Sequence, residues 1–367
     1  MPSSSSLALR AAIACVLLAA CPPKSQPDTK SPNDVATDSD DTLPERPPVE
    51  RSGELMAAGR APEALKVLDD ALTSTPNDPD LHYARGIALA QMARPAEALA
   101  AWQAAIKVAP NYYAAHNAIG AVEIDAGHTE AAIAAFEAAI AAKSDFPDAH
   151  YNLGRARMAA GQDALARAAL ETANRLSPED VDILFALTEL HRKAGRLDDA
   201  LATAKAAAQR APDDAEIRRT LGHVLMEKDE FAAAQAEFSA ALQKKPDDVD
   251  AKLGLARALI KLDRAEEALV PLADLAARLP DQAIVWSEWG AALAKLGKFD
   301  GPEGALARLD KALTLKPDLA SAHIRKVGAL AQAKQCKQAK EALKAFTARK
   351  PKPEALDQAK TAAAACK

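Results

Sequence analysis

The sequence is poor in aromatic side chains. They make up 4% of its 367 residues, although 49% of the residues are hydrophobic, so a folded core has to be built largely from alanine and leucine. Small side chains of this kind suit helices that pack closely together. A basic excess is also missing, because the formal net charge is −5. The composition therefore gives no reason to expect nucleic acid as a partner.

Sequence motifs for catalysis are missing as well. The chain contains no CxxC, HExxH or GxSxG pattern, and its Gly301–Gly304 segment lacks the lysine that a phosphate-binding loop requires. We therefore expect no catalytic residue, no metal ion and no cofactor, and we do not expect an enzyme.

The chain has instead a period of 34 residues. Small residues and prolines recur at this spacing: Gly86, Gly120 and Gly154; Ala98, Ala132 and Ala166; Pro178, Pro212, Pro246 and Pro280. A proline in every period ends a helix, because it cannot donate the helical hydrogen bond, and this excludes one continuous coiled coil. The period predicts helix hairpins, each covering the apolar face of the next.

The unit resembles the tetratricopeptide repeat, whose pattern has an aromatic residue at position 4, glycine at 8, alanine at 20 and 27, and proline at 32. Two units read His116-x2-Ile119-Gly120 and His150-x2-Leu153-Gly154. The resemblance implies an all-α, right-handed superhelical solenoid of about nine hairpins over residues 51–351, with a capping helix over residues 352–367. Four histidines share position 4 and are expected to pack rather than to bind metal: His82, His116, His150 and His323.

The first twenty residues have the character of an export signal. Arg10 precedes an apolar run from Ala11 to Ala20, which as a helix would span about 15 Å, half of a bilayer core of about 30 Å. That length is typical of a signal peptide. Leu18-Ala19-Ala20-Cys21 resembles the lipobox of bacterial lipoproteins, which implies removal of residues 1–20 and acylation of Cys21. An ordinary secreted protein is the alternative.

Residues 21–50 connect this cysteine to the repeats. From residue 22 onward the segment holds seven acidic residues against three basic ones, together with seven prolines. A segment of this composition cannot bury a core and is expected to be a disordered tether. The lipoprotein resemblance implies a membrane-anchored protein of the bacterial envelope that faces the periplasm, and Pro22 after the cysteine favours the outer membrane over the inner one.

Cys336 and Cys366 remain once the leader is removed and Cys21 is acylated. Each lies fifteen residues from Pro351, so an antiparallel hairpin that turns at this proline would bring the two sulfur atoms side by side. In an oxidising compartment we expect a disulfide. Two free thiols are the alternative.

Each predicted hairpin consists of a first and a second helix. Positions 5 and 9, which lie on the first helix, supply the candidate binding residues. In the family that the chain resembles, these positions line a concave groove for a protein or peptide partner. The candidates mix aromatic, basic and polar side chains: Tyr83, Asn117, Tyr151, Arg155, Phe185, Glu189, Arg219, His223, Leu253 and Arg257. The alternative is that they form solvated helix faces.

These observations suggest a lipid-anchored envelope scaffold that binds a protein or peptide in its groove and helps to assemble or stabilise an envelope complex. A structural periplasmic protein without a dedicated ligand is one alternative. A cytosolic adaptor is another, if the leader does not function.

Overall fold

The computed structural model describes residues 46–366. Within this range, nineteen α-helices and a final 3-10 helix, η1, follow one another without a strand. The helices are α2 (Pro48–Ala57), α3 (Ala61–Ser74), α4 (Pro79–Gln91), α5 (Pro95–Val108), α6 (Tyr113–Asp125), α7 (Thr129–Ala142), α8 (Pro147–Ala159), α9 (Asp163–Leu176), α10 (Val181–Lys193), α11 (Leu197–Arg210), α12 (Ala215–Glu227), α13 (Phe231–Lys244), α14 (Val249–Lys261), α15 (Ala265–Arg278), α16 (Ala283–Lys295), α17 (Ala305–Leu315), α18 (Ala320–Gln332), α19 (Cys336–Ala348), α20 (Pro353–Ala362) and η1 (Ala363–Cys366).

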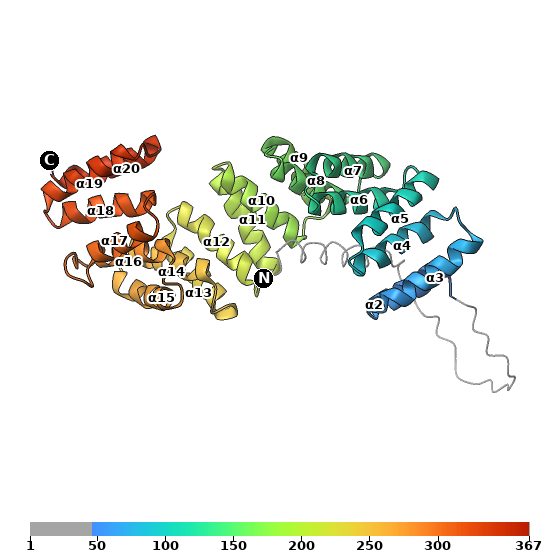
Figure 1. Cartoon of the computed structure of the whole chain (residues 1–367), viewed down its shortest axis with the longest axis horizontal. Helices are drawn as coiled ribbons and strands as arrows, with labels where there is room; N and C mark the ends of the chain where they lie inside the picture. Colours follow the sequence, from blue (N-terminus) through green and yellow to red (C-terminus); the bar gives the residue numbers. More distant parts are fainter. Residues whose placement is uncertain (1–45, 367) are drawn as a thin grey trace, which may run out of the picture. The chain divides into compact units, whose positions relative to one another are not determined.

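The helices come in nine successive pairs, from α2 with α3 to α18 with α19, and Figure 1 shows them in sequence order. The predicted all-α array of helix hairpins is therefore confirmed. The chain divides into two compact units, one up to Ala186 and one from Leu187, with the division inside α10. We call them the first and the second unit. The predicted leader and Cys21 lie outside the described residues.

Glycine at position 8 lets the second helix of a hairpin approach the backbone of the first. A Cβ atom on Gly86 would lie 2.2 Å from the indole nitrogen of Trp102, and one on Gly120 would lie 2.5 Å from the Phe136 ring. Such distances are far below van der Waals contact. The aromatic residue at position 24 thus occupies the space that the missing side chain leaves, which explains why glycine recurs with the period.

Position 4 of the first helix secures the end of the preceding repeat. The Nε2 atoms of His82 and His116 each lie 2.8 Å from the carbonyl oxygens of Pro76 and Pro110, six residues earlier. His150 and His323 make the same contact at 2.9 Å, and the indole of Trp286 donates to the carbonyl of Pro280 at 2.8 Å. These side chains therefore have a structural use. Between residues 46 and 366, no group of three or more histidine, cysteine or acidic side chains could hold a metal ion.

The second unit ends in a helix that packs on the last hairpin. Helix α20 contacts α18 and α19, and η1 contacts the same pair. Cys336 at the start of α19 and Cys366 in η1 form a disulfide, with their Cα atoms 5.2 Å apart. In the described part of the chain, no helix combines the length and apolar character needed to cross a membrane.

Candidate partner-binding face

All four tyrosines of the chain lie in the first unit, within or beside α4, α6 and α8: Tyr83, Tyr112, Tyr113 and Tyr151. The ring of Tyr83 on α4 lies 5.2 Å from the ring of Tyr112, which directly precedes α6. The Tyr112 hydroxyl donates a hydrogen bond to Oδ1 of Asp80 at 2.6 Å. Tyrosine therefore links two successive first helices.

The next repeat continues this arrangement. Tyr113, the first residue of α6, meets Phe146, the residue before α8, edge to face with ring centroids 5.0 Å apart. Burial raises the pKa of Tyr83, and Tyr113 and Asp148 raise it further. We call Tyr83, Tyr112, Tyr113 and Phe146 the aromatic cluster. Tyr83 is buried, whereas the other three rings are half-exposed.

A cation covers part of the aromatic cluster. The Lys143 amine lies 4.7 Å from the centre of the Tyr113 ring and 5.8 Å from that of Phe146, within the range of a cation–π interaction. The cluster thus combines partly exposed rings with a positive charge.

Tyr151 and Arg155 form a second aromatic and cationic pair, one turn apart on α8. The Arg155 guanidinium lies 5.6 Å from the Tyr151 ring; Arg155 is exposed and Tyr151 half-buried. Burial raises the pKa of Asp125 on α6, and Arg155 opposes this rise. The surface of α8 therefore offers a ring and a cation together.

Three predicted groove residues are buried instead: Tyr83 (9% exposed), Asn117 (3%) and Leu253 (7%). The Tyr112 ring lies against Tyr83, and the amide of Asn152 on α8 donates to Asn117 Oδ1 at 3.1 Å. Leu253 belongs to an apolar cluster with Leu272 and Val285. The prediction that these three line the groove surface is wrong, because neighbouring side chains cover them.

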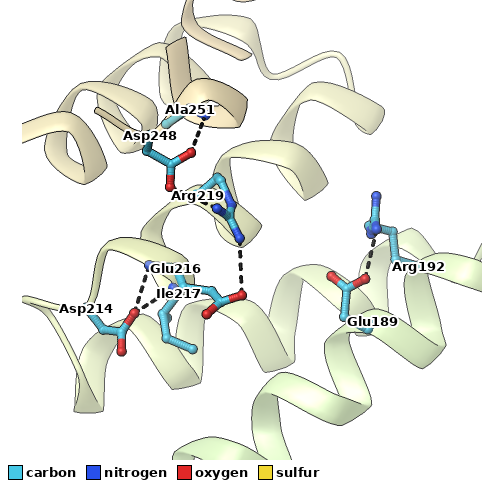
Figure 2. Close-up of polar contacts among 8 residues, drawn as sticks. All are labelled: Glu189, Arg192, Asp214, Glu216, Ile217, Arg219, Asp248 and Ala251. Atoms are coloured by element: carbon cyan, nitrogen blue, oxygen red, sulfur yellow. Dashed lines mark hydrogen bonds and ion pairs between the residues drawn. The ribbon is translucent and has the colours of Figure 1, made fainter. Parts of the chain in front are cut away.

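Arg219, a predicted groove residue of the second unit, is engaged by carboxylates of its own chain. It donates to Asp248 Oδ2 at 2.8 Å and to Glu216 Oε1 at 3.1 Å, as Figure 2 shows. Asp248 is 4% exposed, and its other oxygen accepts from the backbone N–H of Ala251 at 3.0 Å. The arginine thus fixes the start of the next first helix, α14.

Arg257 is held in the same way by a buried carboxylate. Its Nε donates to Glu288 Oε1 at 2.6 Å, and Arg325 donates to Glu288 Oε2 at 2.7 Å and to Ser287 Oγ at 2.8 Å. Glu288 is only 1% exposed. A buried carboxylate needs such partners, because leaving water is costly for an ion. Glu288 therefore joins three successive first helices, α14, α16 and α18.

The remaining candidates lie nearer the division between the units. Glu189 accepts from Arg192 at 2.8 Å, and Arg192 also donates to Glu227 on α12 at 3.0 Å; Figure 2 draws the first contact. His223 is half-buried, with its ring centroid 5.1 Å from that of Phe238. Phe185, on the part of α10 that belongs to the first unit, is half-buried.

The structure thus brings together residues that the sequence analysis did not select. Tyr112 and Phe146 occupy the N-cap position before α6 and α8 without capping the helix by a side chain, whereas Asp78 and Asp214 do cap α4 and α12. In the sequence, an aromatic residue at a position where other repeats have a capping aspartate could have indicated that Tyr112 and Phe146 have another role.

Comparison with known proteins gives the following matches. Models of the tetratricopeptide repeat match residues 54–92, 79–112, 122–161, 147–180, 164–224 and 225–296, which together amount to more than half of the chain. No curated protein sequence matches the chain significantly.

Three solved structures have similar folds. PilF of Pseudomonas aeruginosa is 16% identical, with a TM-score of 0.50 over 55% of this chain and 92% of that one. PilW, a type IV pilus biogenesis factor, is 19% identical, with a TM-score of 0.50 over 56% of this chain and 95% of its own. The Cut9–Hcn1 structure of the APC/C is 17% identical, with a TM-score of 0.51 over 77% of this chain and 55% of that one. At these identities the likeness concerns the fold.

Proposed function

Since the chain belongs to the tetratricopeptide repeat family, we propose that it is a scaffold that binds a protein or peptide partner on the first-helix face of its first unit. The face consists of the half-exposed rings of the aromatic cluster, with Lys143, and of the Tyr151–Arg155 pair. It lies on α6 and α8, on the residues that directly precede them, and on Lys143 at the end of α7.

One observation carries this proposal. The four tyrosines of the chain all lie in three successive repeats. Tyr83 is buried in the core, but the rings of the other three are half-exposed, and the alanine and leucine packing of the other repeats indicates that a stacked hairpin does not need them. Tyrosine and arginine are enriched among the residues that dominate binding energy at protein interfaces. Half-exposed rings beside the half-exposed Lys143 and the exposed Arg155 fit such a use.

Replacing Tyr151 and Arg155 by alanine tests the proposal. We expect the double variant to lose at least about tenfold in partner affinity, because interface residues of these types often contribute more than about 2 kcal/mol. Its helical content should stay that of the wild type. The readout is in-cell crosslinking followed by identification of the captured protein, then titration with that protein.

A matched pair in the second unit provides the control. The Lys261 amine lies 5.5 Å from the Phe231 ring, so the Phe231→Ala/Lys261→Ala variant removes the same kinds of groups from another place. Equal losses in the two variants would contradict a binding face on the first unit, as would full binding by the Tyr151→Ala/Arg155→Ala variant.

The second part of the proposal concerns the location of the protein in the cell. The lipobox-like Leu18–Cys21 and the acidic, proline-rich residues 21–50 support a lipid anchor at Cys21 and a tether from which the array reaches its partner in the envelope. The likeness to the folds of PilF and PilW is compatible with a role in assembling or stabilising an envelope complex.

Cell fractionation of a Cys21→Ser variant tests the anchor. The wild-type protein should sediment with membranes and resist extraction by high salt, whereas the variant should appear in the soluble fraction once salt is added. A variant that still resists salt extraction would exclude anchoring through this residue.

A further inference from the structure

Positive charge is concentrated at the C-terminal end of the second unit. Residues 320–367 hold eleven lysines and arginines against three acidic residues, whereas the chain before them has a net negative charge. The overall net charge of −5 does not reveal this difference between the two parts of the chain. The last hairpin and its capping helix are thus the basic part of an otherwise acidic protein.

Most of this charge lies on and around α19, the helix labelled beside α20 near the C-terminus in Figure 1. Lys337, Lys340 and Lys344 are spaced three and four residues apart, which places them on one side of the helix. Lys334 precedes the helix, and Arg349, Lys350 and Lys352 follow it. We call these seven exposed residues the basic face.

The basic face lacks compensating carboxylates. Among the described residues, none of its seven cations forms an ion pair within 4 Å, whereas the neighbouring Lys326 and Lys360 pair with Asp310 and Asp357. Glu341 is the one acidic residue on α19. Seven exposed cations without counter-charges attract an anionic partner.

The side chains indicate what kind of anion this is. Six of the seven are lysines, which act as mobile point charges, whereas specific recognition of a phosphate or carboxylate favours the planar fork of arginine. Single-stranded nucleic acid is bound by stacking on exposed aromatic rings. The aromatic ring of α19, Phe346, is 2% exposed and stacked on His323. These features favour a surface of many diffuse negative charges.

We propose that the basic face binds the surface of a membrane that contains anionic phospholipids, through electrostatic attraction and without insertion of side chains. Each lysine or arginine near such a surface strengthens the attraction roughly fivefold. The contact is independent of the aromatic cluster and of acylation at Cys21. In an anchored protein it would give the array a second membrane contact.

Vesicle co-sedimentation of the full chain carrying Cys21→Ser tests this proposal, because acylation then plays no part. The protein should sediment with phosphatidylcholine vesicles that contain about one-third phosphatidylglycerol, and it should remain in solution with phosphatidylcholine alone. Raising the salt concentration to about 0.5 M should abolish sedimentation, since the screening length falls to a few ångströms.

Charge reversal locates the contact. Lys337→Glu/Lys340→Glu/Lys344→Glu should lower the partition coefficient about a hundredfold or more, as three contributions of roughly fivefold are lost, and glutamine at the same positions should give a smaller loss. Lys107→Glu/Lys205→Glu/Lys245→Glu makes the same change in net charge at exposed lysines elsewhere and should keep most of the binding. Circular dichroism checks that each variant is folded.

Three results would overturn the proposal. The first is no sedimentation of the Cys21→Ser chain with anionic vesicles, and the second is an equal loss in the two lysine-to-glutamate triple variants. The third is displacement from vesicles by polyglutamate or by a single-stranded oligonucleotide at lower charge concentration than the lipid, which would assign the basic face to an acidic protein or to a nucleic acid instead.

Discussion

Side chains at equivalent repeat positions make different contacts in the two units. At positions 5 and 9 of the first helices, the first unit places Tyr151 and Arg155 with a ring and a cation directed at each other on the surface. The second unit places Arg219 and Arg257 there, and each donates to a buried carboxylate on the next first helix or directly before it. The same groove positions thus serve recognition in one unit, as we propose, and cohesion in the other.

The difference shows that an arginine in a repeat groove is not by itself a binding residue. Whether it is available depends on the facing residue of the next repeat. Asp248 and Glu288 engage the arginines of the second unit, whereas the corresponding link between α6 and α8 is the neutral Asn117–Asn152 hydrogen bond.

Replacing Glu288 by alanine should have the largest effect on stability. The change leaves Arg257 and Arg325 without their shared carboxylate, and breaking a buried ion pair costs about 3 to 5 kcal/mol; we expect the low end because both arginines are partly exposed. Urea unfolding followed by circular dichroism measures the loss. Glu227→Ala, which removes an exposed partner of Arg192, should cost less than about 1 kcal/mol. Equal losses would contradict cohesion through Glu288.

Breaking the disulfide should have the next largest effect. Cys336 and Cys366 are separated by 30 residues, and closing a loop of this size stabilises a fold by about 2 to 4 kcal/mol. We expect Cys336→Ser/Cys366→Ser to raise amide hydrogen exchange in α19 and α20 and to leave the helices of the first unit unchanged. Unchanged exchange in α20 would show that packing alone holds the capping helix.

A pH dependence confined to the second unit should be the smallest effect. Burial, together with Arg192 and Arg219, lowers the pKa of His223. The unfolded chain therefore takes up a proton as pH falls through about 6.5, while the folded unit does not. The contribution of His223 to stability is present above that pH and is lost as pH falls toward the folded pKa.

The free energy of unfolding should therefore decrease between about pH 7.5 and about pH 5.5, and His223→Gln should reduce this slope. Burial lowers the pKa of His323 too, so part of the slope should remain. Urea titrations at the two pH values measure it. A slope that is unchanged in the variant would show that His223 takes no part.

The 34-residue period predicted the helical hairpins well, because its recurring residues are those that the packing and the ends of the helices within one hairpin require. Glycine at position 8 is needed wherever an aromatic or leucine side chain packs on the helix backbone, as Trp102 does on Gly86. Proline at position 32 is needed where the second helix ends. Both can be read without knowing how the repeats stack.

The binding face could not be predicted to the same degree, because it depends on contacts between repeats. Arg219 and Asp248 are 29 residues apart, and Arg257 and Glu288 are 31 residues apart, so only the stacking of hairpins shows that they meet. Burial of Tyr83 likewise depends on Tyr112, the residue that directly precedes the next first helix, α6. Tyr112, Tyr113 and Phe146 were missed because they lie at positions 34 and 1, outside the first-helix positions that the family pattern assigns to the groove.

Site-specific photo-crosslinking in cells gives the most direct test of the contrast between the two units. A photoreactive residue at position 155 lies beside Tyr151 on the first unit, and one at position 250, on α14, is also exposed, on the second unit. We predict a crosslinked partner from position 155 and none from position 250. Crosslinking from position 250 alone, or equal yields from both positions, would contradict a recognition face that is confined to the first unit.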